Sequence, residues 1–265
     1  GITAHKAVDL INQQGVDVIV IDHHEPDEGK LPGAVAIINP KQKDCPYPFK
    51  HLASVGLVTK LAQALLGKDK CEHILDIAAI GTVADVVPLR GENRILVKSG
   101  LPKINITKNR GLMALLELTK IQDKKLSPFH IGFVLGPRIN AAGRMDSAHT
   151  SLDLFLSEDK KEAYDLARAL DKHNGQRQTM QRDIIDEALA LVEQETNFKD
   201  HKVIVLGKEG WHKGVLGIVA SRLTDKYYRP AIVISIEDGI GTASARSIDG
   251  FHLHDALSGC AEFLE

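Results

Sequence analysis

The chain has 265 residues, 43% of them hydrophobic and 26% charged, with a formal net charge of −2. This composition is typical of a globular protein with one large or two modest domains, and it excludes a disordered chain. We find neither an apolar run of membrane-spanning length nor a signal-peptide pattern, so we expect a cytoplasmic protein without a membrane role. Cys45, Cys71 and Cys260 are widely spaced, which indicates reduced thiols rather than a disulfide framework or a zinc site.

The charge is unevenly distributed along the chain. Residues 98–144 contain nine Lys or Arg and two acids, whereas residues 158–195 contain ten acids and six bases. The basic segment has the charge needed to follow a phosphate backbone, and a solvated lysine-rich face is the alternative.

The most informative stretch is a short apolar run that ends in three polar residues. Residues 4–14 have helical spacing, and the β-branched run at 18–21 predicts a buried strand. Asp22, His23 and His24 follow this strand directly. Ligands bind at the carboxyl ends of strands in open α/β sheets, and carboxylate and imidazole bind Mn²⁺, Zn²⁺ or Fe²⁺. A simple turn, with Asp22 as a cap, is the alternative.

The next elements favour a parallel α/β sheet. A second strand is predicted at residues 34–39 and a helix at 51–66, so the order is strand, loop, strand, helix. Short helices are predicted at 93–100 and 111–119.

Residues 74–89 form a second informative stretch, nearly all apolar and rich in small residues that permit close packing. Asp85 lies between Ala84 and Val86, so we expect it to be buried, and a buried carboxylate must be paired or bind a metal. A helix cap or a turn before Pro88 is the alternative. Asp76, near the start of the helix, is better placed to interact with the helix dipole.

Two arginines flank small residues between positions 136 and 146. Arg138 and Arg144 would form a phosphate clamp, because guanidinium makes bidentate bonds to phosphate oxygens. A structural pair between an arginine and Asp146 is the alternative.

A long polar-rich helix is predicted over residues 158–195, with Gly175 as the point where it would be interrupted. Unbroken, it would span about 57 Å and bridge two domains. The second domain is predicted to contain strands at 202–206 and 231–235, a strand or turn at 241–247, and helices at 215–223 and 253–264.

Five ordered sequence blocks resemble the DHH superfamily of phosphoesterases, and within it the single-strand-specific 5′→3′ DNA exonucleases. The tripeptide alone is a weak signal, but the blocks span nearly the whole chain. They are Asp22-His23-His24, residues 81–89, residues 136–145, residues 214–222 and Ser244-Ala245-Arg246-Ser247, with Asn174, Arg177 and Gln178 in the long helix.

The resemblance implies an α/β fold with two domains. A parallel-sheet DHH domain over residues 1–157 would be joined by a long connecting helix, 158–196, to a smaller α/β DHHA1 domain over 197–265.

The resemblance also implies a two-metal site for Mn²⁺ or Mg²⁺ that hydrolyses phosphodiesters. His23 and Asp85 are the expected metal ligands, and Asp22 is a further ligand or a supporting carboxylate. His24, with Asp22 as the second catalytic residue, is expected to face the scissile phosphate and stabilise its developing charge.

Substrate contacts are implied by three further blocks. Arg138, Asn140 and Arg144 are expected to contact the phosphate backbone, His212 to face substrate, and Ser244 and Arg246 to receive the 5′-phosphate end. The implied substrate is single-stranded DNA in repair and recombination, with a single-strand-binding protein and a helicase as candidate partners.

The chain departs from the family pattern at both ends. The family's Asp-x-Asp motif, its Gly-Gly-His block and its single-strand-binding OB domain are absent, and Gly1-Ile2 resembles the end of a further motif. We therefore expect an internal piece of a longer enzyme that lacks several metal carboxylates. By itself it is expected to hold at most one weakly bound ion and to be nearly inactive.

Two alternatives remain open. One is a superfamily relative that degrades oligoribonucleotides or cyclic dinucleotides, although such proteins lack so long a helix and the 136–145 block. The other is an inactive replication scaffold or helicase subunit, a class that tends to lose the metal residues that are present here.

Overall fold

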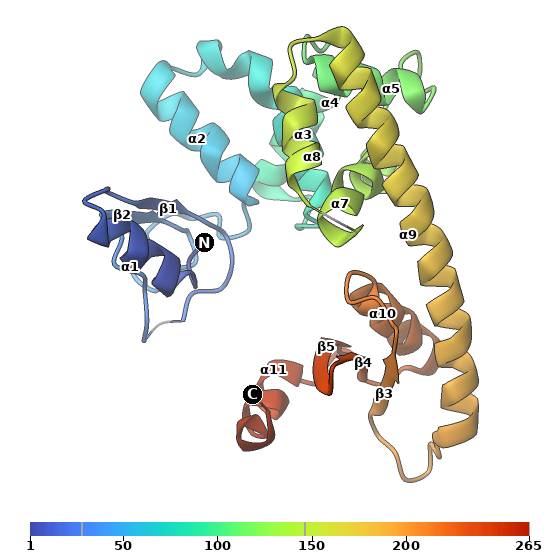
Figure 1. Ribbon diagram of the computed structural model, residues 1–265. Helices are drawn as coiled ribbons and strands as arrows, with labels where there is room; N and C mark the ends of the chain where they lie inside the picture. The colour runs from blue at the N-terminus through green and yellow to red at the C-terminus, as the bar shows by residue number, and fades with distance from the viewer. Residues whose placement is uncertain (28, 146, 265) are drawn as a thin grey trace. The chain divides into compact units, whose positions relative to one another are not determined.

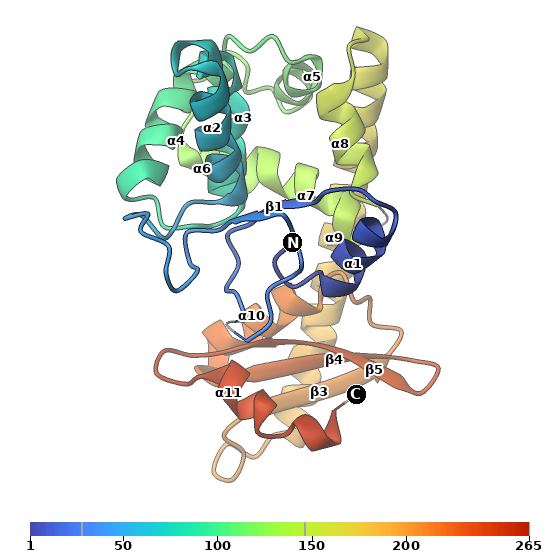
Figure 2. The same cartoon turned by 90° about the vertical axis from the view of Figure 1, so that its left-hand side faces the viewer.

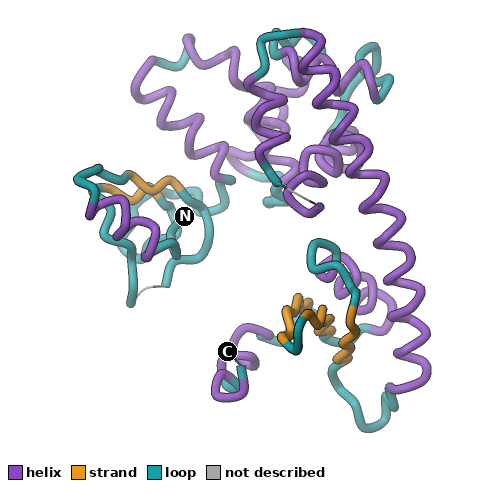
Figure 3. The backbone as a smooth tube through the Cα atoms, in the orientation of Figure 1, coloured by secondary structure: helices purple, strands orange, loops and turns teal. Residues whose placement is uncertain are grey.

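The computed structural model describes residues 1–27, 29–145 and 147–264, including every side chain in these ranges except that of residue 195. The chain divides into two compact units. The first comprises Gly1–Ile139 and Asp153–Ala167, and the second comprises Asn140–Leu152 and Arg168–Glu265. Each unit combines helices with a parallel strand pair, as the purple and orange segments of Figure 3 show, so the predicted α/β class is confirmed. Within the described ranges, no helix is both long and apolar enough to cross a membrane.

The first unit contains the predicted parallel pair β1 (Ile19–Ile21) and β2 (Ala36–Ile38). Ile19 lies opposite Ala36 and Ile21 opposite Ile38. The backbone N–H of Asp22 donates to the carbonyl of Ile38, at 3.1 Å, so the ladder continues into the polar tripeptide. The carboxyl end of β1 is therefore held firmly where the site residues begin.

Helix α3 (Leu75–Ala84) is central to the helical part of the first unit, and its small residues permit the close packing that the sequence predicts. A β-carbon at Gly81 would lie 2.8 Å from Val55 of α2, and one at Gly100 would lie 2.0 Å from the Leu75 carbonyl oxygen. Larger residues at these two positions would force the helices apart. The helices of this part are α1 (His5–Gln13), α2 (Ser54–Leu66), η1 (Asp69–Ile74), α3, α4 (Gly91–Ile104), α5 (Arg110–Leu118), α6 (Pro128–His130) and the π-helix η2 (Ile131–Leu135).

Three helices have residues in both units: α7 (Gly136–Met145), α8 (His149–Leu156) and α9 (Lys160–Glu195). Helix α9 is the long helix that the sequence predicts, and it is prominent in Figure 1. The predicted interruption at Gly175 is wrong, because the helix continues through it. A glycine inside a helix costs about 1 kcal/mol, which the rest of a 36-residue helix with a packed second half outweighs.

The second unit is built on a three-stranded sheet of order β3-β4-β5, visible in Figure 2. Strand β4 (Ala231–Glu237) pairs in parallel with β3 (Ile204–Glu209) and antiparallel with β5 (Ile240–Arg246). Helix α10 (Leu216–Tyr227) packs on this sheet. The segment that the sequence left as strand or turn, 241–247, is thus a strand through Arg246. The predicted final helix is broken at Gly259 into α11 (Leu253–Ser258) and η3 (Ala261–Phe263).

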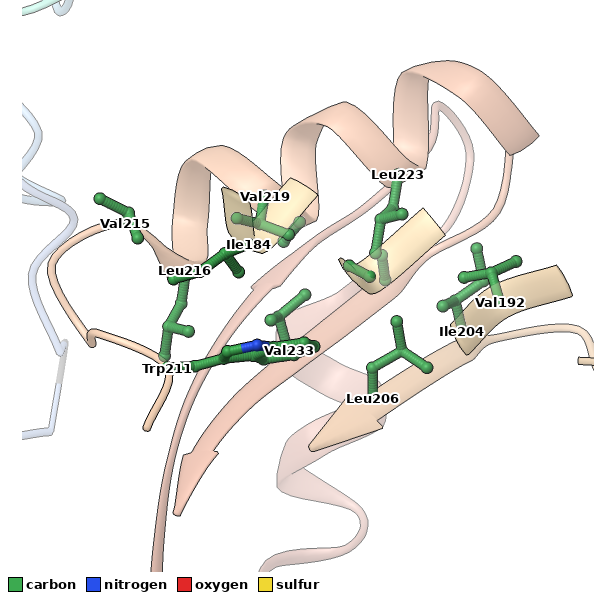
Figure 4. Packing of buried hydrophobic residues seen from close by; sticks show 13 residues of the cluster. Ile184, Val192, Ile204, Leu206, Trp211, Val215, Leu216, Val219, Leu223 and Val233 are labelled. Carbon is green, nitrogen blue, oxygen red and sulfur yellow. The ribbon is translucent and has the colours of Figure 1, made fainter. Parts of the chain in front are cut away.

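Figure 4 shows how α9, α10 and the sheet share one hydrophobic core. Ile184 and Val192 of α9 pack with Leu206 of β3 and Val233 of β4. Trp211 closes one end of this core at 2% exposure, and its Nε1–H donates to the carboxylate of Glu187 at 2.8 Å. The second half of α9 therefore belongs to the core of the second unit although the helix is polar on average.

Candidate active site

Asp22 organises the turn that follows β1. Its carboxyl group is buried, with the residue 5% exposed. Oδ2 accepts the backbone N–H of Ile2 at 2.7 Å, and Oδ1 accepts the backbone N–H groups of His23 and His24 at 2.7 and 3.2 Å. These bonds tie the first residues of the described chain to the end of the strand and fix the backbone from which both histidines project.

The same contacts determine the charge of Asp22. Burial alone would raise the pKa of this carboxyl. The hydrogen bonds from the Ile2 backbone, the His24 side chain and the backbone of His24 and His23 outweigh burial and hold the pKa well below its ordinary value. Asp22 is therefore ionised throughout the neutral pH range.

His24 is held at one ring nitrogen and open at the other. Its Nδ1 lies 2.6 Å from Asp22 Oδ1, and since an ionised carboxylate only accepts hydrogen bonds, Nδ1 carries the proton. The His24 side chain is 72% exposed, so Nε2 is available to a ligand. Asn39, a buried residue at the end of β2, donates to the His24 carbonyl at 2.9 Å. Sequence reasoning missed Asn39, and its position just after the second strand was the available signal.

His23 points to the second carboxylate that the sequence singles out. Its Nε2 lies 3.2 Å from Oδ2 of Asp85, so residues 62 positions apart in sequence meet at one point. The expectation that Asp85 is buried is wrong, because its side chain is 38% exposed. Helix α3 ends at Ala84 with Asp85 as its C-cap, and Val86 then turns the chain outward at a left-handed φ of 59°. Val86 is 86% exposed, so the apolar neighbours do not enclose the carboxylate.

These residues fit a divalent cation. Ligand atoms of Asp22, His23 and His24 lie within 4.8 Å of one another, and imidazole and carboxylate together suit Mn²⁺. His23 and Asp85 add an imidazole nitrogen and a carboxylate oxygen 3.2 Å apart, and both ligand types would suit the same ion. Asp22 already accepts four hydrogen bonds, which favours a supporting role for it.

Asp76 has the structural role that its position predicts. It is buried in the first turn of α3, where it accepts the backbone N–H of Ile77 at 2.7 Å and the Thr107 hydroxyl at 2.5 Å. Both hydrogen bonds of Asp76 are to residues of the first unit, so they stabilise the start of α3.

The second unit brings together Ser244, Arg246 and the first turn of α10. Ser244 and Arg246 lie on one face of β5, since side chains alternate along a strand. A β-carbon at Gly217 would lie 2.9 Å from both Ser244 Oγ and Arg246 Nη2, so both groups approach the same glycine. Arg246 Nη1 donates to the Ala245 carbonyl at 2.7 Å, which fixes one edge of the guanidinium. We call Gly217, Ser244 and Arg246 the phosphate cradle, after the phosphate contact that the family resemblance leads us to expect there.

Arg144 and His212 meet in the same unit. Arg144 Nη1 donates to the Gly214 carbonyl at 3.2 Å, and a β-carbon at Gly214 would lie 2.0 Å from the Arg144 carbonyl oxygen. The Gly214 N–H donates to His212 Nδ1 at 3.1 Å, so Nε2 of that ring carries the proton. Burial lowers the pKa of the Arg177 guanidinium, and the positive charge of Arg144 lowers it further, so two cations are near one another here.

The remaining predicted residues of α7 are assigned to different units. Arg138 belongs to the first unit, where its Nη1 donates to the Val134 carbonyl at 2.7 Å, and Asn140 is an exposed residue of the second. The alternative of an arginine pair with Asp146 lies outside the described residues.

Known protein families match both the first and the last part of the chain. A profile of the DHH family, N-terminal domain, matches residues 1–82, and a DHHA1 domain profile matches residues 200–264. The first part of the chain is thus similar to DHH N-terminal domains and the last part to DHHA1 domains.

The chain is also similar to RecJ over its whole length. It is 46% identical over 266 residues to the single-stranded-DNA-specific exonuclease RecJ of Bacillus subtilis (strain 168), and the match covers 100% of this chain and 33% of that protein. The crystal structure of RecJ from Thermus thermophilus in complex with Mn²⁺ has a TM-score of 0.84 and 33% identity, covering 99% of this chain and 38% of that one. The Mg²⁺ complex has a TM-score of 0.73 and 32% identity, covering 94% and 37%. The chain thus spans about a third of the length of these relatives.

Proposed function

We propose that the protein is a metal-dependent exonuclease that degrades single-stranded DNA from its 5′ end, as part of DNA repair and recombination. The observation that carries this proposal is the meeting of His23 and Asp85 at 3.2 Å, beside the hydrogen-bonded Asp22, at the carboxyl end of β1. The similarity to RecJ exonucleases supports the substrate class.

We propose Mn²⁺ or Mg²⁺ as cofactor in a two-metal site, with His23, Asp85 and Asp22 among the residues that hold it. The chemistry that divalent ions supply at such a site is activation of a water for attack on the phosphodiester and stabilisation of charge on the phosphate oxygens. Asp22 holds the backbone of the tripeptide in place, since its oxygens already accept hydrogen bonds from three N–H groups of the backbone. Asp85, partly exposed and anionic, faces His23 from the end of α3.

His24 has the geometry of a group that acts on the scissile phosphate. Its Nδ1–H is bonded to the buried Asp22 carboxylate, which orients the ring, and the side chain is 72% exposed, so Nε2 is open to a phosphate. The ring would thus be positioned to contact a phosphate oxygen where negative charge develops. Asp22 and His24 are thus proposed to act together.

The phosphate cradle is proposed to recognise the 5′ end of the strand. A terminal phosphate monoester carries more negative charge than an internal diester, and Arg246 with Ser244 offers a guanidinium and a hydroxyl that converge on one point. Internal phosphates are proposed to contact Arg138, Asn140, Arg144 and His212. The buried Arg177 Nε, which has no acceptor among the described residues, adds to the positive character of the second unit.

We further propose that the functional domains are a DHH domain at 1–157, a connecting helix at 158–196 and a DHHA1 domain at 197–265. A helicase that opens duplexes and a protein that coats single strands are proposed partners. A nuclease confined to single strands depends on another protein to open the duplex, and it acts on strands that a coating protein would bind. The three free cysteines, Cys45, Cys71 and Cys260, support a reducing compartment such as the cytoplasm.

The proposal is tested by incubating the full-length protein with matched end-labelled substrates in Mn²⁺, in Mg²⁺ and in EDTA. We expect mononucleotides from a 5′-phosphorylated single strand, much slower release from the same sequence as a blunt duplex, and no release in EDTA. Preferential cleavage of short oligoribonucleotides or of a cyclic dinucleotide would favour the alternative enzyme class instead. Tight strand binding without cleavage in either metal would favour a scaffold.

A further inference from the structure

Two phenylalanine rings are stacked on the surface of the first unit. Phe129 and Phe133 are 60% and 71% exposed. Their ring centroids are 4.9 Å apart and their planes are inclined by 27°. Large aromatic side chains are normally buried, so two exposed rings stacked on each other are an unusual surface feature. We call Phe129 and Phe133 the aromatic pair.

The segment that carries the aromatic pair is fixed on both sides. Ser127 and His130 form a capping box at the start of α6, with the Ser127 N–H donating to His130 Nδ1 at 3.2 Å. The His130 ring also meets Phe129 edge-on, at 6.0 Å between centroids. Ile131 and Leu135 are fully buried, whereas the rings at 129 and 133 point outward. The π-helix that contains Phe133 is a local irregularity of a kind that is frequent at functional sites.

The segment that carries the aromatic pair packs against the last turn of α3 within the same unit. A β-carbon at Gly132 would lie 3.8 Å from Val83, and one at Gly136 would lie 3.5 Å from the β-carbon of Ala84. Val83 and Ala84 form the last turn of α3, and Asp85 follows them directly. The two glycines thus seat the aromatic segment against the residues that position the Asp85 carboxylate.

The loop that leads into α6 carries two cations close to the pair in sequence. Lys124 and Lys125 are exposed in the loop that leads into α6. Flat apolar rings beside flexible cations are the combination that proteins use to bind single strands, with rings for the bases and cations for the phosphates. An apolar protein segment would not require the cations.

We propose that the aromatic pair is a nucleobase-stacking platform that holds the single strand beside the candidate metal centre. This inference rests on the proposed function and deepens it. Stacking is open only to bases freed from a duplex, and every base offers a π-face, so the platform would select single strands without selecting sequence. It would position the strand while His23, His24 and Asp85 perform the chemistry.

The first test measures strand binding in EDTA, where cleavage does not interfere, by fluorescence anisotropy with a 5′-phosphorylated oligonucleotide. Phe133→Ala and Phe129→Ala are each expected to weaken binding by about 5- to 150-fold, the range for loss of one stacked base. Both variants should bind an abasic strand of equal length as the wild type does. Phe133→Leu, which keeps apolar volume but loses the flat ring, should behave like Phe133→Ala. Leu65→Ala is the matched control, an exposed apolar residue (74%) of the same unit, and it should bind normally.

A second variant reads stacking directly. Phe133→Trp should keep wild-type affinity. The fluorescence of the new tryptophan, obtained by subtracting the wild-type signal of the buried Trp211, should be quenched when the normal strand binds. It should not be quenched when the abasic strand binds. Equal losses for normal and abasic strands, normal binding by both alanine variants, or no quenching would each overturn the platform. A cleavage assay of the wild-type protein distinguishes the two proposals. If the wild type degrades single strands and the aromatic variants bind strands normally, the proposal of a stacking platform is wrong and the proposed function stands. If the wild type degrades no strand in either metal, the proposed function is wrong.

Discussion

The candidate metal centre and the phosphate cradle hold their functional groups in opposite ways. In the metal centre a buried carboxylate with four hydrogen bonds fixes the backbone, and the functional side chains project from it. In the phosphate cradle the functional groups lie on an edge strand, where Arg246 is exposed and a single glycine provides the room they need.

This difference separates two kinds of mutational effect. A change at Asp22 is expected to alter folding and chemistry together, because the same hydrogen bonds would serve both. A change at Arg246 is expected to leave the core of the second unit intact and to alter only what the surface binds. Each prediction below probes one side of this contrast, in order of decreasing effect.

The largest effect is expected at the two histidines, and it should differ in kind between them. His23→Ala in the full-length protein should reduce cleavage by about 1,000-fold or more and weaken Mn²⁺ binding, because it removes a metal ligand. His24→Ala should slow the chemical step by about 100- to 1,000-fold with Mn²⁺ affinity nearly unchanged. Manganese titration and single-turnover rates separate the two, with His73→Ala as the control. Equal loss of Mn²⁺ affinity in both variants would contradict the division of roles.

Asp22→Asn tests whether the metal centre is coupled to folding. The amide keeps the shape but loses charge-assisted bonds, so we expect a loss of about 1.5–3 kcal/mol in the free energy of unfolding at pH 7. Because the folded-state pKa of Asp22 is depressed, its contribution is fully present above the ordinary Asp pKa of about 3.9 and is lost as the pH falls below it. The free energy of unfolding, measured with urea, should therefore fall less between pH 7 and pH 3 in the variant than in the wild type. If the free energy of unfolding fell equally with pH in the wild type and the variant, Asp22 would not be the group that causes the loss of stability in acid.

Arg246→Ala tests whether the phosphate cradle reads the strand end. Binding of a 5′-phosphorylated strand should weaken by about 10- to 150-fold, the effect of one charge-assisted contact, and binding of a 5′-hydroxyl strand should change much less. Arg144→Ala, which changes a cation outside the cradle, should weaken both strands alike and reduce the salt slope by about one. The end-reading assignment fails if Arg246→Ala affects the two strands equally.

Gly217→Ala should have the smallest effect, confined to the phosphate cradle. The added β-carbon would lie 2.9 Å from Ser244 Oγ and Arg246 Nη2, and both side chains can move aside at little cost. We expect the preference for a 5′-phosphate to fall by about 2- to 10-fold with an unchanged melting temperature. Gly207→Ala on β3, where a β-carbon would meet Ile234 at an ordinary 3.5 Å, is the control. If the melting temperature fell in Gly217→Ala but not in Gly207→Ala, Gly217 would be needed for packing rather than for the phosphate cradle.

The sequence predicts the strand pair, the long helix and the polar tripeptide because each depends on local pattern. The apolar run from Val18 to Ile21 is followed directly by Asp22, and this change from apolar to charged residues identifies the carboxyl end of a strand from sequence alone. The meeting of His23 with Asp85 is also expected, but only through the family resemblance, since 62 residues separate them. The structure supplies the distance.

The errors arise where tertiary context decides. Asp85 looks buried because its neighbours are apolar, yet it is the C-cap of α3 and Val86 adopts a left-handed turn that exposes both residues, so the alternative of a helix cap or a turn before Pro88 is the one that the structure shows. Asn39 and the Ile2 amide escape notice because their roles depend on where two distant segments cross. The aromatic pair is equally hidden, since Phe129 and Phe133 at a spacing of four are typical of a buried helix face.

The central claim is that His23, and not His24, is the imidazole ligand of the metal. Pulsed EPR of the Mn²⁺-loaded full-length protein reports nitrogen bound directly to the ion. Nitrogen modulation should be present in the wild type, persist in His24→Ala and disappear in His23→Ala. Modulation that survives in His23→Ala, or that is lost in His24→Ala, would contradict the account.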